Sequence, residues 1–226
     1  MKVSKIALVL LVLLSVGVVY KGRHRIINYA RENHWVYYQF PESKLAHEML
    51  DHLQGVEIGA SAHNPFNLNT RNIDYTDDYS TSFKEAEKLC TGRCAKVDIV
   101  ASGDNLLLAN GSVDFVISSH VIEHFYDPIK TVQEWLRVVK PGGYVYMIVP
   151  HKERTFDRDK ARTTLAELIR RHEFPDDPIP PHHDHHSFWI TADFIDLCDY
   201  MGWKIAAVQD VDDKVGNGFT VVIQKI

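Results

Sequence analysis

The sequence predicts an α/β fold in which a mostly parallel sheet is covered by helices on both faces. Short apolar segments typical of buried strands alternate with helical or connecting segments from residue 42 to residue 150. An amphipathic helix that ends at Lys140-Pro141-Gly142-Gly143 separates two of these strands. Strands joined by helical crossovers imply parallel pairing, with both faces of the sheet buried.

Five strands are expected in this part of the chain. They are Val56–Ile58, Asn72–Tyr75, Val97–Ala101, Val113–Ser119 and Tyr144–Val149. A helix opens at Pro41 and stops at Gln54-Gly55, because apolar residues recur between them at helical spacing. The amphipathic helix before the fifth strand carries Ile129, Val132, Leu136 and Val139 on one face.

After Pro150 the alternation breaks. A polar helix is expected over about 160–172, followed by the proline- and histidine-rich stretch EFPDDPIPPHHDHH. A helix over Thr191–Met201 then leads to two strands, Trp203–Val211 and Gly218–Ile226, joined by a hairpin-like turn at Asp212–Asn217. We interpret about 152–190 as a lid or acceptor-binding insertion.

Composition narrows the function classes. With 45% hydrophobic and 24% charged residues among 226, the chain is globular rather than disordered or collagen-like. The net charge is −5 and no basic block follows residue 25, so a nucleic-acid partner is not expected. Three cysteines, Cys90, Cys94 and Cys198, lack zinc or redox spacing and are interpreted as plain thiols.

The amino terminus holds an apolar run, Ile6–Tyr20, flanked by basic residues on both sides. Its length is at or just under the lower limit of about 17 residues for a membrane span. Three alternatives stay open: a membrane anchor in residues 1–25, a cleaved signal with Ser15-Val16-Gly17 as the small-residue site, or a buried or partner-binding helix. Residues 26–41 are interpreted as a connecting segment.

Small and polar residues follow each predicted strand, where open α/β sheets bind ligands. They are Glu57-Ile58-Gly59-Ala60-Ser61-Ala62, Asp74, Ser102-Gly103-Asp104-Asn105, Ser118-Ser119-His120 and His151. Small side chains let a ligand approach the backbone, and a carboxylate at a strand end accepts hydrogen bonds from both hydroxyls of a ribose.

The order of these motifs resembles class I S-adenosylmethionine-dependent methyltransferases. The residues that carry the resemblance are VEIGAS (56–61), NIDY (72–75), SGDNL (102–106), SVDFVISSHVIEHFYDP (112–128) and WLRVVKPGGYVYMIVP (135–150). The resemblance covers about residues 42–226 and is strongest over 112–150. It implies a Rossmann-like, doubly wound, seven-stranded sheet with an antiparallel last strand, a methyltransferase domain over 42–226, and S-adenosylmethionine as cofactor.

The resemblance also assigns cofactor-binding residues. Glu57 matches the acidic position that orients the loop or the methionine amino group, and Gly59 the first glycine of the family's loop. Asp74 matches the acid that takes the ribose hydroxyls. The residue at the adenine edge falls on Ser102 or Asp104, of which we prefer Asp104.

Ala60, Asn105 and Ser119 complete the predicted cofactor site. One departure from the family stands out, because Ser61 and His63 hold later glycine positions of the loop. These two residues either narrow the pocket for the methionine part of the cofactor or contact the cofactor through their side chains. Ser61 is kept in the predicted cofactor site. A nicotinamide-binding Rossmann domain is the alternative for this fold, but only Gly59 of its G-x-G-x-x-G fingerprint is present.

Methyl transfer from a sulfonium needs a base only where the acceptor is protonated at working pH. His120, His124 and His151 are the candidates, as general base or acceptor contact, with a packing role as the alternative for each. The run His182-His183-Asp184-His185-His186 offers metal ligands, but adjacent residues rarely converge on one ion. We predict no metal and favour a substrate-loop role.

The sequence thus predicts a methyltransferase acting on a small-molecule, lipid or glycan acceptor, with a catalytic domain that is cytoplasmic and either free or membrane-anchored. Two alternatives stay open. The first is a non-catalytic, anchored S-adenosylmethionine-binding module, and the second is a secreted or metal-dependent hydrolase built on the histidine run. The acceptor atom and the oligomeric state are not predicted.

Overall fold

The computed structural model describes residues 38–175 and 185–226. Phe40–Asp78 and Ala95–Ile226 form one compact unit, and the described residues 38–39 and 79–94 belong to a second. The first unit holds the sheet and the candidate site, and the second holds the helix α3 (Ser82–Thr91).

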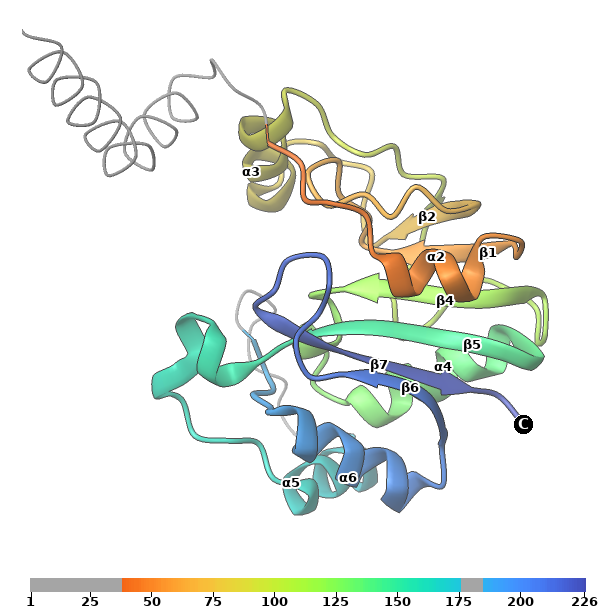
Figure 1. Cartoon of the computed structure of the whole chain (residues 1–226), viewed down its shortest axis with the longest axis vertical. Helices are drawn as coiled ribbons and strands as arrows, with labels where there is room; N and C mark the ends of the chain where they lie inside the picture. The colour runs from red at the N-terminus through yellow and green to blue at the C-terminus, as the bar shows by residue number, and fades with distance from the viewer. Residues whose placement is uncertain (1–37, 176–184) are drawn as a thin grey trace, which may run out of the picture. The chain divides into compact units, whose positions relative to one another are not determined.

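A seven-stranded mixed sheet is the centre of the larger unit, which confirms the predicted strand number and the antiparallel strand near the C-terminus. Its order is β3-β2-β1-β4-β5-β7-β6, with β7 antiparallel to both of its neighbours and the first five strands in that order parallel (Figure 1). The strands are β1 (Gly55–Ile58), β2 (Thr70–Asp74), β3 (Ile99–Val100), β4 (Val113–Ser119), β5 (Val139–Pro150), β6 (Lys204–Gln209) and β7 (Gly218–Gln224).

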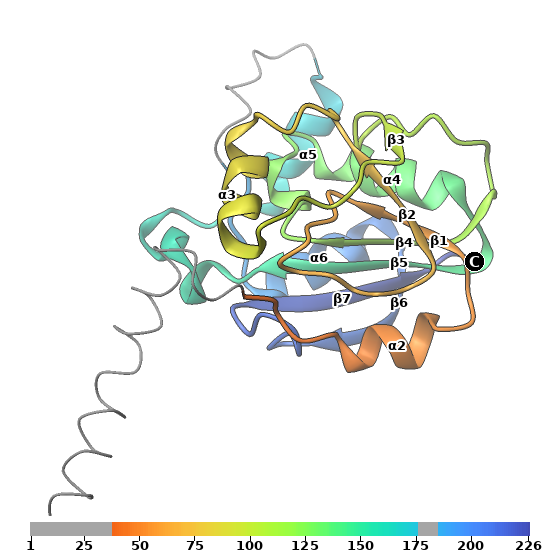
Figure 2. The same ribbon diagram turned by 90° about the horizontal axis from the view of Figure 1, so that it is seen from above.

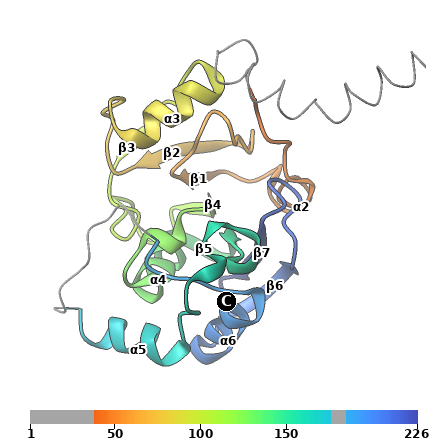
Figure 3. The same cartoon turned by 90° about the vertical axis from the view of Figure 1, so that its left-hand side faces the viewer.

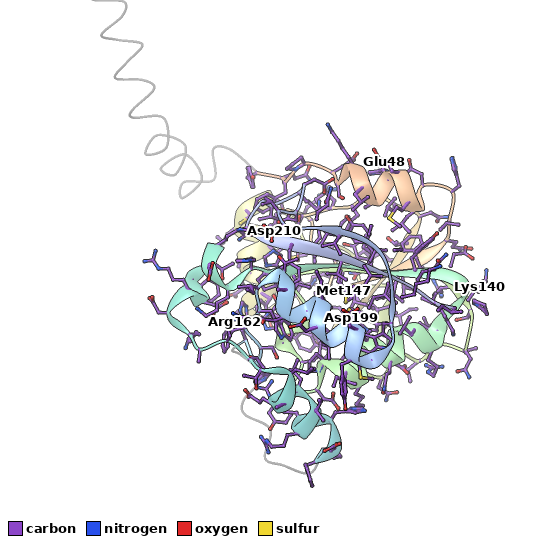
Figure 4. The ribbon with its side chains drawn as sticks, turned by 60° about the horizontal axis from the view of Figure 1, so that its bottom comes forward. Glu48, Lys140, Met147, Arg162, Asp199 and Asp210 are labelled. Carbon is purple, nitrogen blue, oxygen red and sulfur yellow. The ribbon has the colours of Figure 1, made fainter. Side chains whose placement is uncertain are left out.

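Helices cover both faces of this sheet. The helices α4 (Pro128–Val138), α5 (Leu165–Glu173) and α6 (Thr191–Met201) lie on one side, and α2 (Lys44–Leu50) lies on the other (Figure 3). The larger apolar cluster includes Met147 of β5, which Figure 4 labels, together with Trp135, Phe194 and Leu197 of the helices. The smaller cluster joins α2 to the opposite side chains of β4 and β5.

The helix α4 shows why the sequence signal in this part of the chain is strong. Asp127 caps it by accepting a hydrogen bond from the Lys130 N–H at 2.9 Å, and Pro128 stands at its first position. Ile129, Val132 and Trp135 are buried at helical spacing. The prediction was wrong at Val139, which begins β5 instead of closing the helix.

The segment Lys140-Pro141-Gly142-Gly143 therefore lies inside β5, not between helix and strand. The β4–β5 register shifts there, since Val113 pairs with Val139 but Phe115 pairs with Tyr144. A Cβ atom at Gly143 would lie 2.2 Å from the Asp114 carbonyl oxygen. Glycine is needed at this position because the neighbouring strand leaves no room for a side chain.

Other predicted boundaries were wrong by a few residues. The helix α2 begins at Lys44 rather than Pro41, because the Ser43 hydroxyl caps it by accepting from the Ala46 N–H at 3.1 Å. The first part of the predicted 160–172 helix is also not helical, and α5 begins at Leu165 behind the capping Thr164. The expected strands Val97–Ala101 and Trp203–Val211 shrink to β3 and β6.

Several short elements were not predicted. Residues Lys152–Arg154 (η2) and Phe156–Asp159 (η3) form two 3-10 turns after β5, and Ile122–His124 (η1) forms one after β4. The helix α3 lies in sequence between β2 and β3, begins at the capping residue Thr81 and ends at Gly92, which has a φ of 74°. A glycine with positive φ is the common way to end a helix.

None of the helices in the described part of the chain is long and apolar enough to cross a membrane. The apolar run Ile6–Tyr20 and three members of the histidine run, 182–184, lie outside the described residues. The predictions made for them stay predictions.

Candidate functional site

The predicted site residues lie at the carboxyl ends of the parallel strands. The strands β3, β2, β1, β4 and β5 are neighbours in this order and run parallel, so their carboxyl ends lie next to one another (Figure 2). Each predicted cofactor-binding segment leaves the sheet there, as ligand sites in open α/β sheets do.

The turn after β1 is tight and depends on Gly59. This residue has a φ of 67°, and its N–H donates to the Ile73 carbonyl at 2.8 Å. A Cβ atom at this position would lie 3.1 Å from the side chain of Val121. The next residue, Ala60, donates its N–H to the Asn72 side-chain oxygen at 3.0 Å. The turn thus keeps its backbone close to the end of β4.

The two residues that replace family glycines hydrogen-bond to each other. The Ser61 hydroxyl and the His63 Nδ1 are 2.6 Å apart, and the His63 ring packs against Phe40 with centroids 6.1 Å apart. Asn64 then donates from its side chain to the Ser119 hydroxyl at 3.0 Å, which connects the loop to the end of β4. Side-chain contacts therefore hold this loop in place of a second and third glycine.

Asp74 is the last residue of β2, as predicted for a ribose-binding acid. Its carboxylate accepts the Tyr75 N–H at 2.8 Å, and its carbonyl accepts the Ala101 N–H at 2.9 Å. The side chain is half-buried. This position sets one carboxylate beside the carboxyl end of β1 and of β3.

The loop after β3 contains the predicted adenine-edge residues. The Ser102 hydroxyl donates to Asp104, and the Lys130 ammonium donates to the other Asp104 oxygen at 2.8 Å. Burial raises the pKa of Asp104, but these hydrogen bonds from Lys130 and Ser102 outweigh it and hold the pKa below its usual range. Asn105 donates its N–H to the Ser102 carbonyl at 3.0 Å, which closes the loop.

Glu57 lies in the interior, on the face of β1 away from Val56 and Ile58. It is 8% exposed, and burial raises its pKa to about 7, although the positive Lys214 opposes that shift. Burial in turn lowers the pKa of Lys214 to about 8, while Glu57 opposes this shift. The Lys214 ammonium donates to the Pro41 carbonyl at 3.0 Å.

Two of the predicted catalytic histidines lie beside a buried glutamate. His120 follows β4 with a φ of 55°, a left-handed conformation that is uncommon outside glycine. Its Nδ1 is 4.0 Å from Oε1 of Glu123, and the Nε2 of His124 is 3.9 Å from the same oxygen. His185, about 60 residues later in the sequence, also lies beside this glutamate, with its Nε2 3.9 Å from the same oxygen.

Burial dominates the electrostatics of this group. It raises the pKa of Glu123 to about 8. It lowers the pKa of His124 to about 4, and the neighbouring His185 adds to that shift. It also lowers the pKa of His120, against the opposing charge of Asp212. In each case burial disfavours the charged form.

His151, the third predicted catalytic residue, has different neighbours. Its Nδ1 accepts the Glu153 N–H at 3.2 Å and so caps η2, while its own N–H donates to the Asn217 carbonyl at 3.1 Å. It is 6% exposed, and burial together with Arg154 lowers its pKa. These contacts favour the packing role that the sequence left open for this residue.

Sequence reasoning missed four residues at the site: Asn64, Glu123, Lys130 and Asp157. Glu123 belongs to the Ile122-Glu123-His124 motif directly after a predicted strand, and this position could have identified it as a candidate site residue. The other three face partners far away in the chain, and no local pattern marks them.

Comparisons with known proteins match part of this chain to a described family. Residues 58–147 match the model of a family described as a methyltransferase domain, from the end of β1 into β5. These residues are similar to the class I S-adenosylmethionine-dependent methyltransferase superfamily. S-adenosylmethionine is the cofactor of that superfamily.

Two curated relatives of this methyltransferase domain come from mycobacteria. An uncharacterized methyltransferase of Mycobacterium sp. (strain KMS) is 54% identical over 43 residues, which is 19% of this chain and 17% of the relative. A probable S-adenosylmethionine-dependent methyltransferase of Mycolicibacterium smegmatis is 28% identical over 138 residues, which is 58% of this chain and 51% of the relative. The chain thus spans about half or less of these relatives.

Solved structures similar to the methyltransferase domain include a SAM-dependent methyltransferase from Methanosarcina mazei. It is 18% identical, with a TM-score of 0.49, over 81% of this chain and 97% of that one. A possible histamine N-methyltransferase from Thermotoga maritima is 18% identical, with a TM-score of 0.48, over 77% of this chain and 82% of that one.

Proposed function

We propose that this chain is an enzyme that transfers a methyl group from S-adenosylmethionine to a small-molecule, lipid or glycan acceptor. The observation that carries the proposal is the series of strand ends. A left-handed glycine turn, a half-buried carboxylate and a closed polar loop follow β1, β2 and β3 in turn, and these strands are neighbours.

The residues present fit S-adenosylmethionine. Gly59 keeps the turn after β1 free of a side chain in a place where a Cβ would crowd Val121. In our proposal Asp74 accepts the ribose hydroxyls, and the loop Ser102–Asn105 faces the base. The contacts of Asp104 with Lys130 and Ser102 support a role for this loop's backbone as much as for the Asp104 carboxylate.

When bound, the cofactor supplies an electrophilic methyl group on a sulfonium. The chain's own residues have to orient the acceptor and exclude water, which is worth roughly 7–11 kcal/mol of the barrier in well-oriented reactions. His120 stays our candidate for contact with the acceptor, because it directly follows β4, whose last residue Ser119 accepts a hydrogen bond from Asn64 of the loop after β1. His151 we assign to packing at the end of β5.

The proposed class of methyl acceptor is argued from the amino-acid sequence. The apolar run Ile6–Tyr20, as a membrane anchor of a cytoplasmic domain, would bring the enzyme close to lipid or lipid-linked glycan acceptors. Fractionation of cells expressing the full chain tests this. If the run is an anchor, the full chain is found in the membrane fraction, and a variant that lacks residues 1–25 is found in the soluble fraction.

Cofactor binding is tested by calorimetry with S-adenosylhomocysteine. We expect Asp74→Ala to weaken binding about 10- to 150-fold, because a hydrogen bond to a charged group contributes about 1.5–3 kcal/mol. Asp77→Ala removes an exposed carboxylate three residues later and is the matched control, with unchanged affinity. Absence of binding to the folded wild-type chain would contradict the proposal.

Turnover separates the enzyme from a non-catalytic binding module. Incubation with S-adenosylmethionine labelled in its methyl group and with lipid, glycan and small-molecule fractions should label one fraction. Binding of S-adenosylhomocysteine without any labelling would favour the module.

A further inference from the structure

We propose that Glu123, His124 and His185 form a binding site for a divalent transition-metal ion such as Zn²⁺. One oxygen or nitrogen atom from each of these residues lies within 4.8 Å of the others. The site stands whether or not the chain transfers methyl groups. It differs from the sequence prediction of no metal because it combines one member of the histidine run with two residues far from it in sequence.

The first argument is the arrangement around one carboxylate oxygen. Glu123 Oε1 lies 3.9 Å from His124 Nε2 and 3.9 Å from His185 Nε2. These distances exceed the 3.2 Å limit of an ordinary N–H···O hydrogen bond, so the three side chains lie close together without a direct hydrogen bond between the imidazoles and the carboxylate. Ligands of a tetrahedral ion at about 2.0–2.1 Å lie roughly 3.4 Å apart, so the site closes on an ion with small side-chain shifts.

The second argument is the burial of Glu123. Its side chain is 0% exposed, and neither of its oxygens has a hydrogen-bond partner among the described residues. A buried carboxylate without a partner is costly, and metal coordination is one of the few ways to compensate it. Backbone structure fixes the glutamate there, since the His186 N–H donates to the Glu123 carbonyl at 2.7 Å and ties the two segments together.

The third argument is the partner of His185. Its Nδ1 hydrogen-bonds to Oδ2 of the buried Asp157 at 2.7 Å, while its Nε2 faces Glu123. This carboxylate–histidine arrangement is the outer contact that orients metal-binding imidazoles and fixes their tautomer. The ring of Phe156 packs on the same imidazole with centroids 5.1 Å apart, which further holds its orientation.

The donor set indicates the class of ion. Two imidazole nitrogens and one carboxylate oxygen suit Zn²⁺ and related transition metals rather than Ca²⁺ or Mg²⁺, which prefer oxygen ligands. Three protein ligands leave a coordination position for water or a substrate oxygen. His120 is a further polar neighbour of this group, since its Nδ1 is 4.0 Å from the same Glu123 oxygen.

The test is a titration of the full, metal-stripped chain with Co²⁺, followed by competition with Zn²⁺. We expect one Co²⁺ per chain, with the visible absorption bands of a low-coordinate site and no thiolate charge-transfer band. Glu123→Gln and His185→Ala should weaken binding at least 100-fold. Asp157→Asn, which keeps the ligands but removes the outer carboxylate, should weaken it about 10- to 100-fold.

His47→Ala is the control, because His47 also lies between two carboxylates, Glu42 and Asp51, but on the surface of α2. Its affinity should equal that of the wild type. Circular dichroism checks folding, and the near-isosteric Glu123→Gln keeps the test decisive if His185→Ala does not fold. The proposal is overturned if the chain binds less than one equivalent at millimolar Co²⁺, or if Glu123→Gln binds as tightly as the wild type.

Discussion

Glu57 shows how one buried side chain links the end of β1 to the rest of the domain. It stands one residue before Ile58 at the end of β1, and its charge is opposed by Lys214 from the loop between β6 and β7. Lys214 also donates to the Pro41 carbonyl and lies 4.8 Å from the centre of the Phe66 ring. The acidic residue predicted to orient a ligand therefore also has a structural partner.

The raised pKa of Glu57 predicts a pH dependence of folding stability. Between about pH 4.5 and 7 the unfolded chain releases the Glu57 proton while the folded chain keeps it, so the free energy of unfolding falls as pH rises through this window. The effect is on the order of 3 kcal/mol. Urea denaturation of the wild type and of Glu57→Gln should differ in slope over this range.

Below pH 4.5 the carboxyl group is protonated in both states, and the two proteins should then have parallel stability profiles. Glu48→Gln, at an exposed carboxylate of α2, is the control and should keep the wild-type slope between pH 4.5 and 7. Identical slopes for the wild type and Glu57→Gln would show that this carboxyl group has an ordinary pKa.

At the scale of elements, the start of β5 fixes how the two central strands meet. The chain passes from α4 into β5 without a loop, and the register between β4 and β5 shifts between Val113 and Phe115. Gly143 lies against the Asp114 carbonyl at this shift, and Gly142 beside it has a φ of 82° in open space. Two adjacent glycines are thus needed for different reasons.

Alanine substitutions separate these reasons. Gly143→Ala should lower the free energy of unfolding by about 3 kcal/mol, because its Cβ would meet a backbone carbonyl that the β4–β5 pairing holds in place. Gly142→Ala should cost only about 1–2 kcal/mol, the strain of a left-handed alanine. Chemical denaturation of both variants gives the order, and an equal or reversed cost would contradict the packing argument.

At the scale of the whole molecule, the proposed cofactor site joins the ends of several strands. A Cβ atom at Gly59 would lie 3.1 Å from Val121, two residues after β4, and Asn64 of the same loop donates to Ser119 of β4. A ligand bound across these ends interacts with the folded chain but not with the unfolded one. Its binding free energy therefore adds to the stability of the fold.

Thermal unfolding should report this coupling. S-adenosylhomocysteine at 100 times its dissociation constant adds about 2.7 kcal/mol. For a chain of this size that raises the Tm by roughly 5–10 °C. NADH at the same concentration should leave the Tm unchanged, and a larger shift with NADH would favour the nicotinamide-binding alternative.

The parts of the fold that local sequence encodes strongly were predicted correctly. The strand β4 and the helix α6 have the predicted bounds, Val113–Ser119 and Thr191–Met201, since each has a clear apolar pattern and a sharp end. The helix α3 was missed because Ser82–Thr91 contains few apolar residues, although those few lie on one face. Val139 was assigned to the wrong element because an apolar residue fits a helix face and a strand equally well.

By itself, the sequence determined the succession of strands along the chain and the residue types that follow each strand, because both depend on neighbours along the chain. Only the tertiary structure decided the pairings of Glu57 with Lys214, of Asp104 with Lys130, and of Glu123 with His185. Such partners lie far apart in sequence, and the packing of strands and loops brings them together. Local spacing carries no information about which distant side chain will share a buried space.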